Sequence, residues 1–202
     1  MKLITRHMWG AKPAKRQYSK MGEIKGLVVH WSYYPGAIGN QAEIDQIKNI
    51  QQLHQETRNW NDIAYNFLIG NTGQIYEGRG FDARPASQGT PDGNFHYYSV
   101  CWLGGKPPTL PSDKALESIN LLHEQIGGKL KKHSDFKATT CPGPQLSDYV
   151  DGQGVVVDNK QSPEMIHPQF VQKKLDTIIA KLENIENKLK LGNLIRWQTN
   201  TK

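Results

Sequence analysis

Apolar and polar residues follow two different spacings in the first part of the chain. Residues 26–31 read Gly-Leu-Val-Val-His-Trp, a short apolar run that predicts a buried β-strand. Residues 41–57 instead carry an apolar side chain at every third position, which predicts an amphipathic helix with one buried face. These apolar residues are Ile44, Ile47, Ile50 and Leu53. The two patterns indicate a domain that combines strands with helices.

The next stretch predicts a hairpin, a long loop and another strand. Residues 60–70 and 74–80 flank Asn-Thr-Gly, a turn sequence that fits a β-hairpin. Residues 82–95 are rich in Gly, Pro and Asn, and they predict a loop long enough to form the rim of a site. Residues 98–103 form a strand-like run that contains Cys101, which we expect to be a buried thiol acting as a small hydrophobe.

A second helix is predicted over residues 113–126. Pro-Ser-Asp at 111–113 opens it, and Gly127-Gly128 ends it. Residues 1–25 are polar and broken by Gly and Pro, which predicts an irregular segment that lies across the domain. Strands alternating with helices predict an α/β fold, a single domain with a central mixed β-sheet flanked by helices.

The pattern changes beyond residue 150. We expect a domain at 1–150, a linker at 151–168, an amphipathic, coiled-coil-like helix at 169–191 and a tail at 192–202. The helix predicts either a homo-oligomer formed through residues 171–189 or a helix that docks on its own domain. Its heptad positions are Val171, Leu175, Ile178, Leu182, Ile185 and Leu189.

The net charge of the chain excludes few classes of binding partner. The 202 residues carry a net charge of +6 with a pI of about 9.2, which favours acidic polymers in general. Lysine and arginine outnumber acidic residues by 17 to 13 up to residue 150 and by 8 to 6 beyond it, so the basic excess is spread out. There is no basic recognition helix, and we expect no nucleic-acid partner.

The sequence shows no targeting or membrane segment. Its N-terminus has no continuous apolar region of the kind found in signal peptides, and no later stretch approaches the length of a membrane span. Two cysteines are too few for a disulfide framework. We therefore expect a chain made in the cytoplasm without a signal peptide, which needs a separate release step if it acts elsewhere.

Three residues suggest a metal site. His133 and Cys141 lie eight positions apart on a loop of small and turn-forming residues, and both can bind zinc. His30, near the end of the predicted strand at 26–31, is the best third donor. Three ligands leave one tetrahedral position for water, which suits a hydrolytic zinc better than a structural one. His54 is more typical of a packed histidine, and Asp135 of a turn residue than of an acceptor that orients an imidazole.

Four separated motifs then give the sequence a family resemblance. It resembles the zinc-dependent type-2 N-acetylmuramoyl-L-alanine amidases, a family that includes phage lysozyme-like endolysins and peptidoglycan recognition proteins. The matching segments are residues 28–32, 60–69, 73–80 and 133–143, which occur in the family's order. With the opening Trp-Gly-Ala at 9–11, the resemblance spans roughly residues 4–150.

The resemblance implies a reaction and roles for particular residues. The reaction is zinc-dependent hydrolysis of the amide bond between N-acetylmuramic acid and L-alanine in bacterial peptidoglycan, by a phage-type endolysin that reaches the cell wall after release. His30, His133 and Cys141 match the family's zinc ligands. Tyr65 matches its catalytic tyrosine, which would donate a hydrogen bond to the oxyanion. Thr139 matches the position where members carry Lys or Thr, and its hydroxyl can orient water but is a poor general base.

The chain departs from the family pattern in two places that bear on substrate contacts. Gln88 stands where the family often has a histidine, and residues 97–99 read Tyr-Tyr-Ser in place of Ser-Ile-Gly. The sequence leaves two other functions open, a non-catalytic peptidoglycan-binding module and a regulator that binds another protein. Modules of the first kind usually lack the cysteine ligand, whereas this chain keeps Cys141.

Overall fold

The computed structural model describes residues 3–152, 179 and 182–183. It contains a six-stranded sheet in the order β1-β4-β3-β5-β2-β6, in which only the β3–β4 pair is antiparallel. The mixed α/β architecture is therefore confirmed. The strands are β1 (Leu3–Ile4), β2 (Gly26–Trp31), β3 (Phe67–Ile69), β4 (Ile75–Glu77), β5 (Tyr97–Trp102) and β6 (Lys129–Lys132). The helices are α1 (Arg6–Trp9), α2 (Asn40–Gln52), α3 (Pro91–His96), α4 (Asp113–Ile126) and α5 (Pro144–Asp151).

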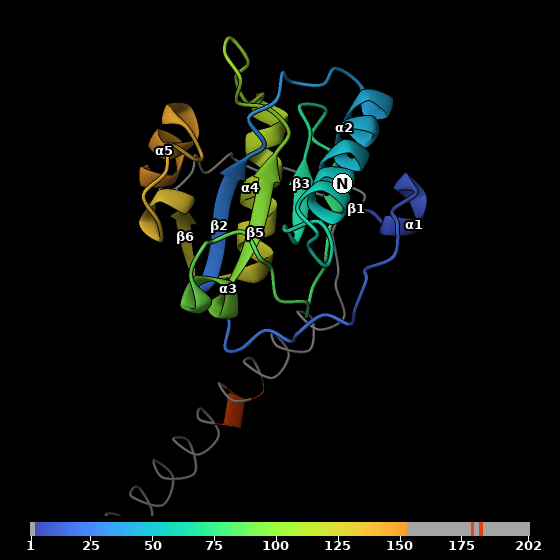
Figure 1. The fold of residues 1–202 in the computed structure, drawn as a ribbon. Coiled ribbons are helices and arrows are strands. Elements are labelled where there is room, and N and C mark those ends of the chain that lie inside the picture. The colour runs from blue at the N-terminus through green and yellow to red at the C-terminus, as the bar shows by residue number, and fades with distance from the viewer. Residues whose placement is uncertain (1–2, 153–178, 180–181, 184–202) are drawn as a thin grey trace, which may run out of the picture. The chain divides into compact units, whose positions relative to one another are not determined.

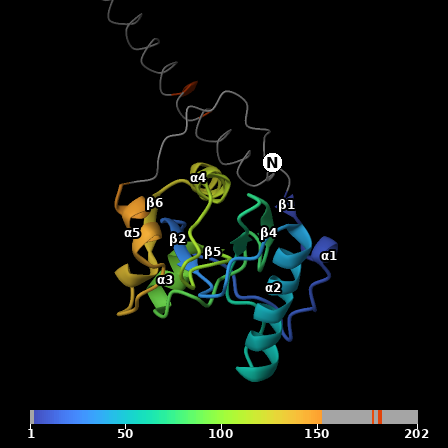
Figure 2. The ribbon, with the colours of Figure 1, turned by 90° about the horizontal axis from the view of Figure 1, so that it is seen from above.

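Helices cover both faces of the sheet. Figures 1 and 2 show α4 over one face and α2 over the other, with α5 beside the β6 edge and α1 beside the opposite edge. The short helix α3 lies at the end of the sheet where β5 begins (Figure 1). The α2 face buries an apolar cluster, and complete burial of one such aliphatic side chain contributes about 1.5–3 kcal/mol. The cluster consists of Trp9, Ile47, Ile50, Ile63, Leu68, Tyr76, Cys101 and Leu103.

The local signals for α4 and the hairpin are confirmed. The Ser112 hydroxyl caps α4 by accepting a hydrogen bond from the Ala115 amide at 3.1 Å, and Gly127 ends the helix with a φ of +74°. β3 and β4 pair around the predicted turn, with Ile69 opposite Ile75. Cys101 is fully buried in β5, as expected.

Four expectations needed correction. The final part of the predicted 82–95 loop is helix α3, capped by Thr90, whose hydroxyl accepts from the Gly93 amide. The N-terminal segment is not wholly irregular, because β1 pairs with β4 and α1 follows it. The predicted helix at 41–57 ends in η1, a π-helical turn at Leu53–Thr57. Tyr65 lies in the loop before β3 and not on a strand.

The C-terminal predictions mostly fall outside the described residues. Of the predicted linker the structure describes Asp151, the last residue of α5, and Gly152. Of the heptad helix it describes Ile179, Leu182 and Glu183, which are helical. The domain boundaries and the homo-oligomer therefore remain predictions. Within the described residues, no helix has both the length and the apolar character needed to cross a bilayer.

Candidate metal centre

The register of two neighbouring strands brings two histidines together. β2 and β6 are parallel with Val29 opposite Lys132, so the next residues along, His30 and His133, leave the pair side by side. Cys141 comes from the turn that precedes α5, where the Gly143 amide donates to the Thr140 carbonyl at 2.7 Å. Residues 111 positions apart in sequence thereby share one site.

The three side chains are close enough to bind one ion. Their potential ligand atoms all lie within 4.8 Å of one another. Cys141 Sγ is 3.7 Å from His30 Nδ1, and the His30 and His133 ring centroids are 4.5 Å apart. Around a tetrahedral metal, nitrogen and sulfur ligands are separated by roughly 3.5 Å, given the usual bond lengths. The arrangement therefore requires little adjustment to hold a metal.

Unsatisfied polar atoms support the same conclusion. Within the described part of the chain, four buried side-chain nitrogen or oxygen atoms make no hydrogen bond of normal geometry. Three of them are His30 Nε2 and both ring nitrogens of His133. Buried polar groups rarely lack a partner, so metal binding is the simplest account of these atoms. His30, His133 and Cys141 thus form a group that fits a metal ion.

Burial sets the protonation of this group. It lowers the pKa of His30 well below its ordinary value, with a further contribution from His133. Burial also lowers the pKa of His133, and Lys137 acts in the same direction while the Gln88 carbonyl opposes them. The histidines are therefore neutral, which is the form that binds metals. Burial raises the pKa of Cys141 to about 12, so a cation is needed to stabilise its thiolate.

Tyr65 lies next to this group. Its ring centroid is 5.4 Å from that of His30 and 5.9 Å from that of His54. Burial raises the pKa of Tyr65 well above its ordinary value, and the nearby Cys101 and Cys141 add to the shift. The phenol is therefore held in its neutral form, which can donate a hydrogen bond.

Thr139 is exposed, and its hydroxyl already has a partner within the chain. The Cys141 amide donates to Thr139 Oγ1 at 3.2 Å. This contact stabilises the turn that carries the cysteine. Thr139 is thus placed to position Cys141 through the backbone.

Three further residues from the sequence analysis make contacts that stabilise the fold. His54 is buried, and its Nδ1 accepts from the Ala64 amide at 3.2 Å, as expected of a packed histidine. Asp135 accepts from the Lys132 amide and pairs with Lys131, as expected of a turn residue. The Gln88 amide points inward and donates to the Tyr97 carbonyl at 2.9 Å.

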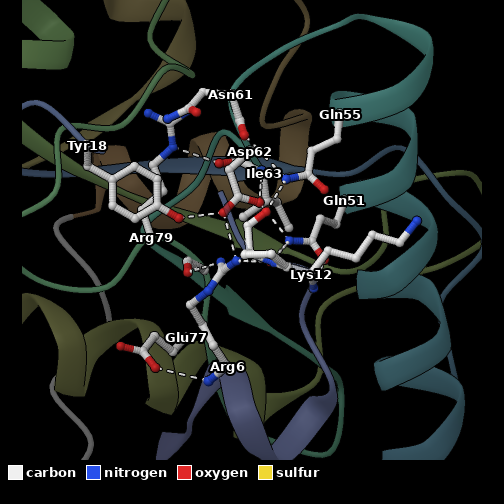
Figure 3. Close-up of polar contacts among 12 residues, drawn as sticks. Arg6, Lys12, Tyr18, Gln51, Gln55, Asn61, Asp62, Ile63, Glu77 and Arg79 are labelled. Atoms are coloured by element: carbon white, nitrogen blue, oxygen red, sulfur yellow. Dashed lines mark hydrogen bonds and ion pairs between the residues drawn. The ribbon is translucent and has the colours of Figure 1, made fainter. Parts of the chain in front are cut away.

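Sequence reasoning missed the buried network around Asp62. Figure 3 shows Arg6, Tyr18 and Gln51 converging on this carboxylate. Arg6 Nη2 and Gln51 Nε2 each lie 2.7 Å from one of its oxygens, and the Ile63 amide donates at 2.7 Å. The network ties the N-terminal segment to α2 and to the loop that carries Tyr65. A lone aspartate in a turn-like sequence gave no local sign of it.

Two cavities differ in chemistry. The larger, of about 680 Å³, is lined by Arg16, Arg79 and Arg84 with several polar residues and Trp60. The smaller, of about 330 Å³, is lined by Trp31, Tyr33, Pro107, Pro108, Thr140 and Gln145, among others. Trp31 and Thr140 are the chain neighbours of His30 and Cys141, so the smaller cavity adjoins the metal group.

One protein family and several known proteins are similar in sequence to this chain. The family described as N-acetylmuramoyl-L-alanine amidase matches residues 20–144. Peptidoglycan-recognition protein LB of Drosophila melanogaster is 28% identical over 187 residues, covering 83% of this chain and 80% of that protein. An N-acetylmuramoyl-L-alanine amidase of Sus scrofa is 29% identical over 150 residues, covering 68% of this chain but 25% of the pig protein.

A solved structure shares the fold. It is the complex of tracheal cytotoxin with the ectodomains of peptidoglycan recognition proteins LCa and LCx, with a TM-score of 0.70 and 26% identity. The alignment covers 75% of this chain and 95% of that one.

Proposed function

The chain belongs to the N-acetylmuramoyl-L-alanine amidase family, and from this membership we propose that it hydrolyses the amide bond between N-acetylmuramic acid and L-alanine in peptidoglycan with the help of zinc. The observation that carries the proposal is the group formed by His30, His133 and Cys141, in which three buried ring nitrogens make no hydrogen bond of normal geometry. We also propose that the protein acts as a phage-type endolysin, released from the cytoplasm to the wall.

The donor set favours zinc among the common metals. Two imidazole nitrogens and one thiolate suit a borderline-soft ion in tetrahedral geometry, whereas calcium and magnesium prefer oxygen ligands. Held by His30, His133 and Cys141, zinc would supply Lewis acidity toward the amide carbonyl and toward water. A set of three protein ligands is the number typical of hydrolytic zinc sites.

Tyr65 and Thr139 take different roles in this proposal. Tyr65 is the proposed catalytic donor, because its buried ring lies beside the His30 ring and its neutral hydroxyl can donate a hydrogen bond to the developing oxyanion. Thr139 is better described as a positioning residue that stabilises the Cys141 turn, although an exposed hydroxyl there can also orient water. A Tyr65→Phe variant should keep its zinc and lose about 100-fold in kcat.

A recognition module that binds peptidoglycan without cutting it is the second candidate. It is favoured by relatives that are named as recognition proteins. A complete set of three potential metal ligands favours the enzyme, because binding alone does not require a hydrolytic metal site.

The deciding experiment measures the release of stem peptide from purified cell wall. We expect release by the zinc-loaded protein, loss of release with a chelator, and recovery when zinc is returned. Cys141→Ser should lose most of its bound zinc, whereas Cys101→Ala, which removes the other thiol, should keep it. Release of stem peptide that a chelator does not reduce would overturn the zinc mechanism. Wall binding with no release by the zinc-loaded protein would establish the recognition module instead.

A further inference from the structure

The smaller cavity is the strongest unexplained feature near the candidate metal centre. It is joined to that centre through the backbone, since the Trp31 amide donates to Cys141 Sγ at 3.4 Å. The ten described residues that line it include no charged side chain. Three arginines line the larger cavity, so the two cavities suit different parts of a substrate.

The Trp31 ring is held in place by two glycines. A Cβ atom on Gly105 would lie 2.5 Å from the ring, and one on Gly143 would lie 2.0 Å from it. Both glycines also have a positive φ, of +110° and +87°, which disfavours other residues there. The indole is therefore fixed beside the metal group before any ligand arrives.

Tyr33 forms the outer lip of the cavity. The residue is 58% exposed, and its ring centroid lies 5.2 Å from that of Trp31 with 56° between the planes. The residue has a φ of +57°, a conformation that costs energy for a non-glycine residue. An exposed aromatic ring held in a costly conformation is more typical of a binding surface than of the core.

We propose that this cavity binds a sugar ring of the peptidoglycan glycan strand, an inference that rests on the proposed function. One face of a hexopyranose presents C–H groups, which pack against the electron-rich face of an aromatic ring. The exposed Thr140 and Gln145 line the cavity and offer a hydroxyl and an amide to sugar hydroxyls, and the Thr109 hydroxyl, which accepts from the Gly36 amide at 3.1 Å, can still donate. The volume of about 330 Å³ is at the small end for ligand sites and suits a small neutral ring.

The charge contrast argues against the stem peptide as the occupant. Stem peptides carry carboxylates, and an uncharged apolar cavity offers them no counter-ion. The scissile bond joins the sugar to the peptide, so the glycan must leave the metal centre on one side. The aromatic cavity supplies that side, so a substrate that keeps the sugar ring should be cleaved better than a lactyl-peptide without it.

The test measures binding of a peptide-free GlcNAc–MurNAc tetrasaccharide by calorimetry. We expect the 202-residue chain to bind it and Tyr33→Ala to bind about fivefold to tenfold more weakly, which is the effect expected for one aromatic contact. Tyr33→Phe, which keeps the ring, should bind as the wild type does. Tyr34→Ala is the matched control, because Tyr34 is adjacent and exposed but lies outside the cavity lining.

Binding can be separated from the proposed function. Cys141→Ser should still bind the tetrasaccharide, so a failure of amide cleavage leaves this measurement intact. If the protein does cleave, Tyr33→Ala should raise KM for intact wall and leave KM unchanged for a D-lactyl-peptide, which keeps the scissile amide but lacks the sugar ring. Equal binding by the wild type and Tyr33→Ala, or no binding by the wild type, would refute the sugar site. Tyr33-dependent binding of an isolated stem peptide would reassign the cavity to the peptide.

Discussion

Two buried polar clusters in the domain are satisfied to opposite degrees. Asp62 is fully buried and accepts hydrogen bonds from Arg6, Tyr18, Gln51 and the Ile63 amide. Three ring nitrogens of His30 and His133 are also buried. Among the described residues, these nitrogens have no hydrogen-bond partner of normal geometry.

The difference separates stability from function. A saturated buried network stabilises one conformation, because loss of any member leaves the others unpaired. A buried polar cluster without hydrogen-bond partners lowers the stability of the folded chain, and such a cluster is expected where its groups bind a ligand. The Asp62 network should therefore govern folding, and the histidine pair should govern metal binding.

The largest expected effect is that of Asp62→Ala. This variant leaves the buried donors of Gln51 and Tyr18 and the charge of Arg6 without their acceptor, and we expect a loss of about 3–5 kcal/mol in the free energy of unfolding. Urea denaturation measures it. The exposed Asp45→Ala, on α2, is the control and should change stability by less than about 0.5 kcal/mol. Equal effects of the two variants would show that the Asp62 network does not govern folding.

His133→Ala should weaken zinc binding strongly and change the stability of the metal-free protein only slightly. Zinc affinity should fall by more than the roughly 10- to 100-fold that loss of an outer partner costs, because a ligand is lost. The metal-free protein should lose no more than about 1 kcal/mol, since no hydrogen bond of normal geometry is broken. Equilibrium dialysis measures the first quantity, and denaturation in a chelator measures the second. Destabilisation of the metal-free protein as severe as that of Asp62→Ala would show that the two clusters do not differ.

His54 sharpens the comparison through pH. Burial, with Arg58 and Arg79, lowers the pKa of His54 from 6.5 to about 4. As the pH falls from about 6.5 towards 4, the unfolded chain takes up a proton that folded His54 does not, so stability decreases, by on the order of 3 kcal/mol in all. Protonation would also remove the acceptor of the Ala64 amide.

The corresponding measurement is the free energy of unfolding at several pH values in a chelator. His54→Gln should show a flatter dependence than the wild type over this range. His7→Gln, which alters an exposed histidine, should keep the wild-type profile. Parallel profiles for the wild type and His54→Gln would mean that His54 does not titrate as proposed.

The smallest expected effect is at Tyr33. Glycine tolerates the φ of +57°, so Tyr33→Gly should raise the free energy of unfolding by about 1 kcal/mol while weakening tetrasaccharide binding. Thermal denaturation and calorimetry measure the two quantities. A variant that is less stable than the wild type would show that the Tyr33 ring serves the fold.

Elements with strong local signals were predicted correctly. The apolar run of β2 and the capped, amphipathic α4 each have a local pattern that indicates which side is buried. β6 has no such pattern, since three of its four residues are lysines, and it is a strand because it pairs with β2. The sequence predicts a loop for the first residues of α3, because Gly, Pro and Asn dominate there, although Thr90 provides a helix cap.

The sequence by itself determined the fold class, the types of residue able to bind a metal and, through resemblance, which three to choose. Only the tertiary structure decided that His30 and His133 meet through the β2–β6 register, that Asp62 is saturated, and that Trp31 is held between Gly105 and Gly143. The reason is physical. Periodicity records whether a side chain is buried, whereas the identity of its partner depends on contacts between segments far apart in the chain.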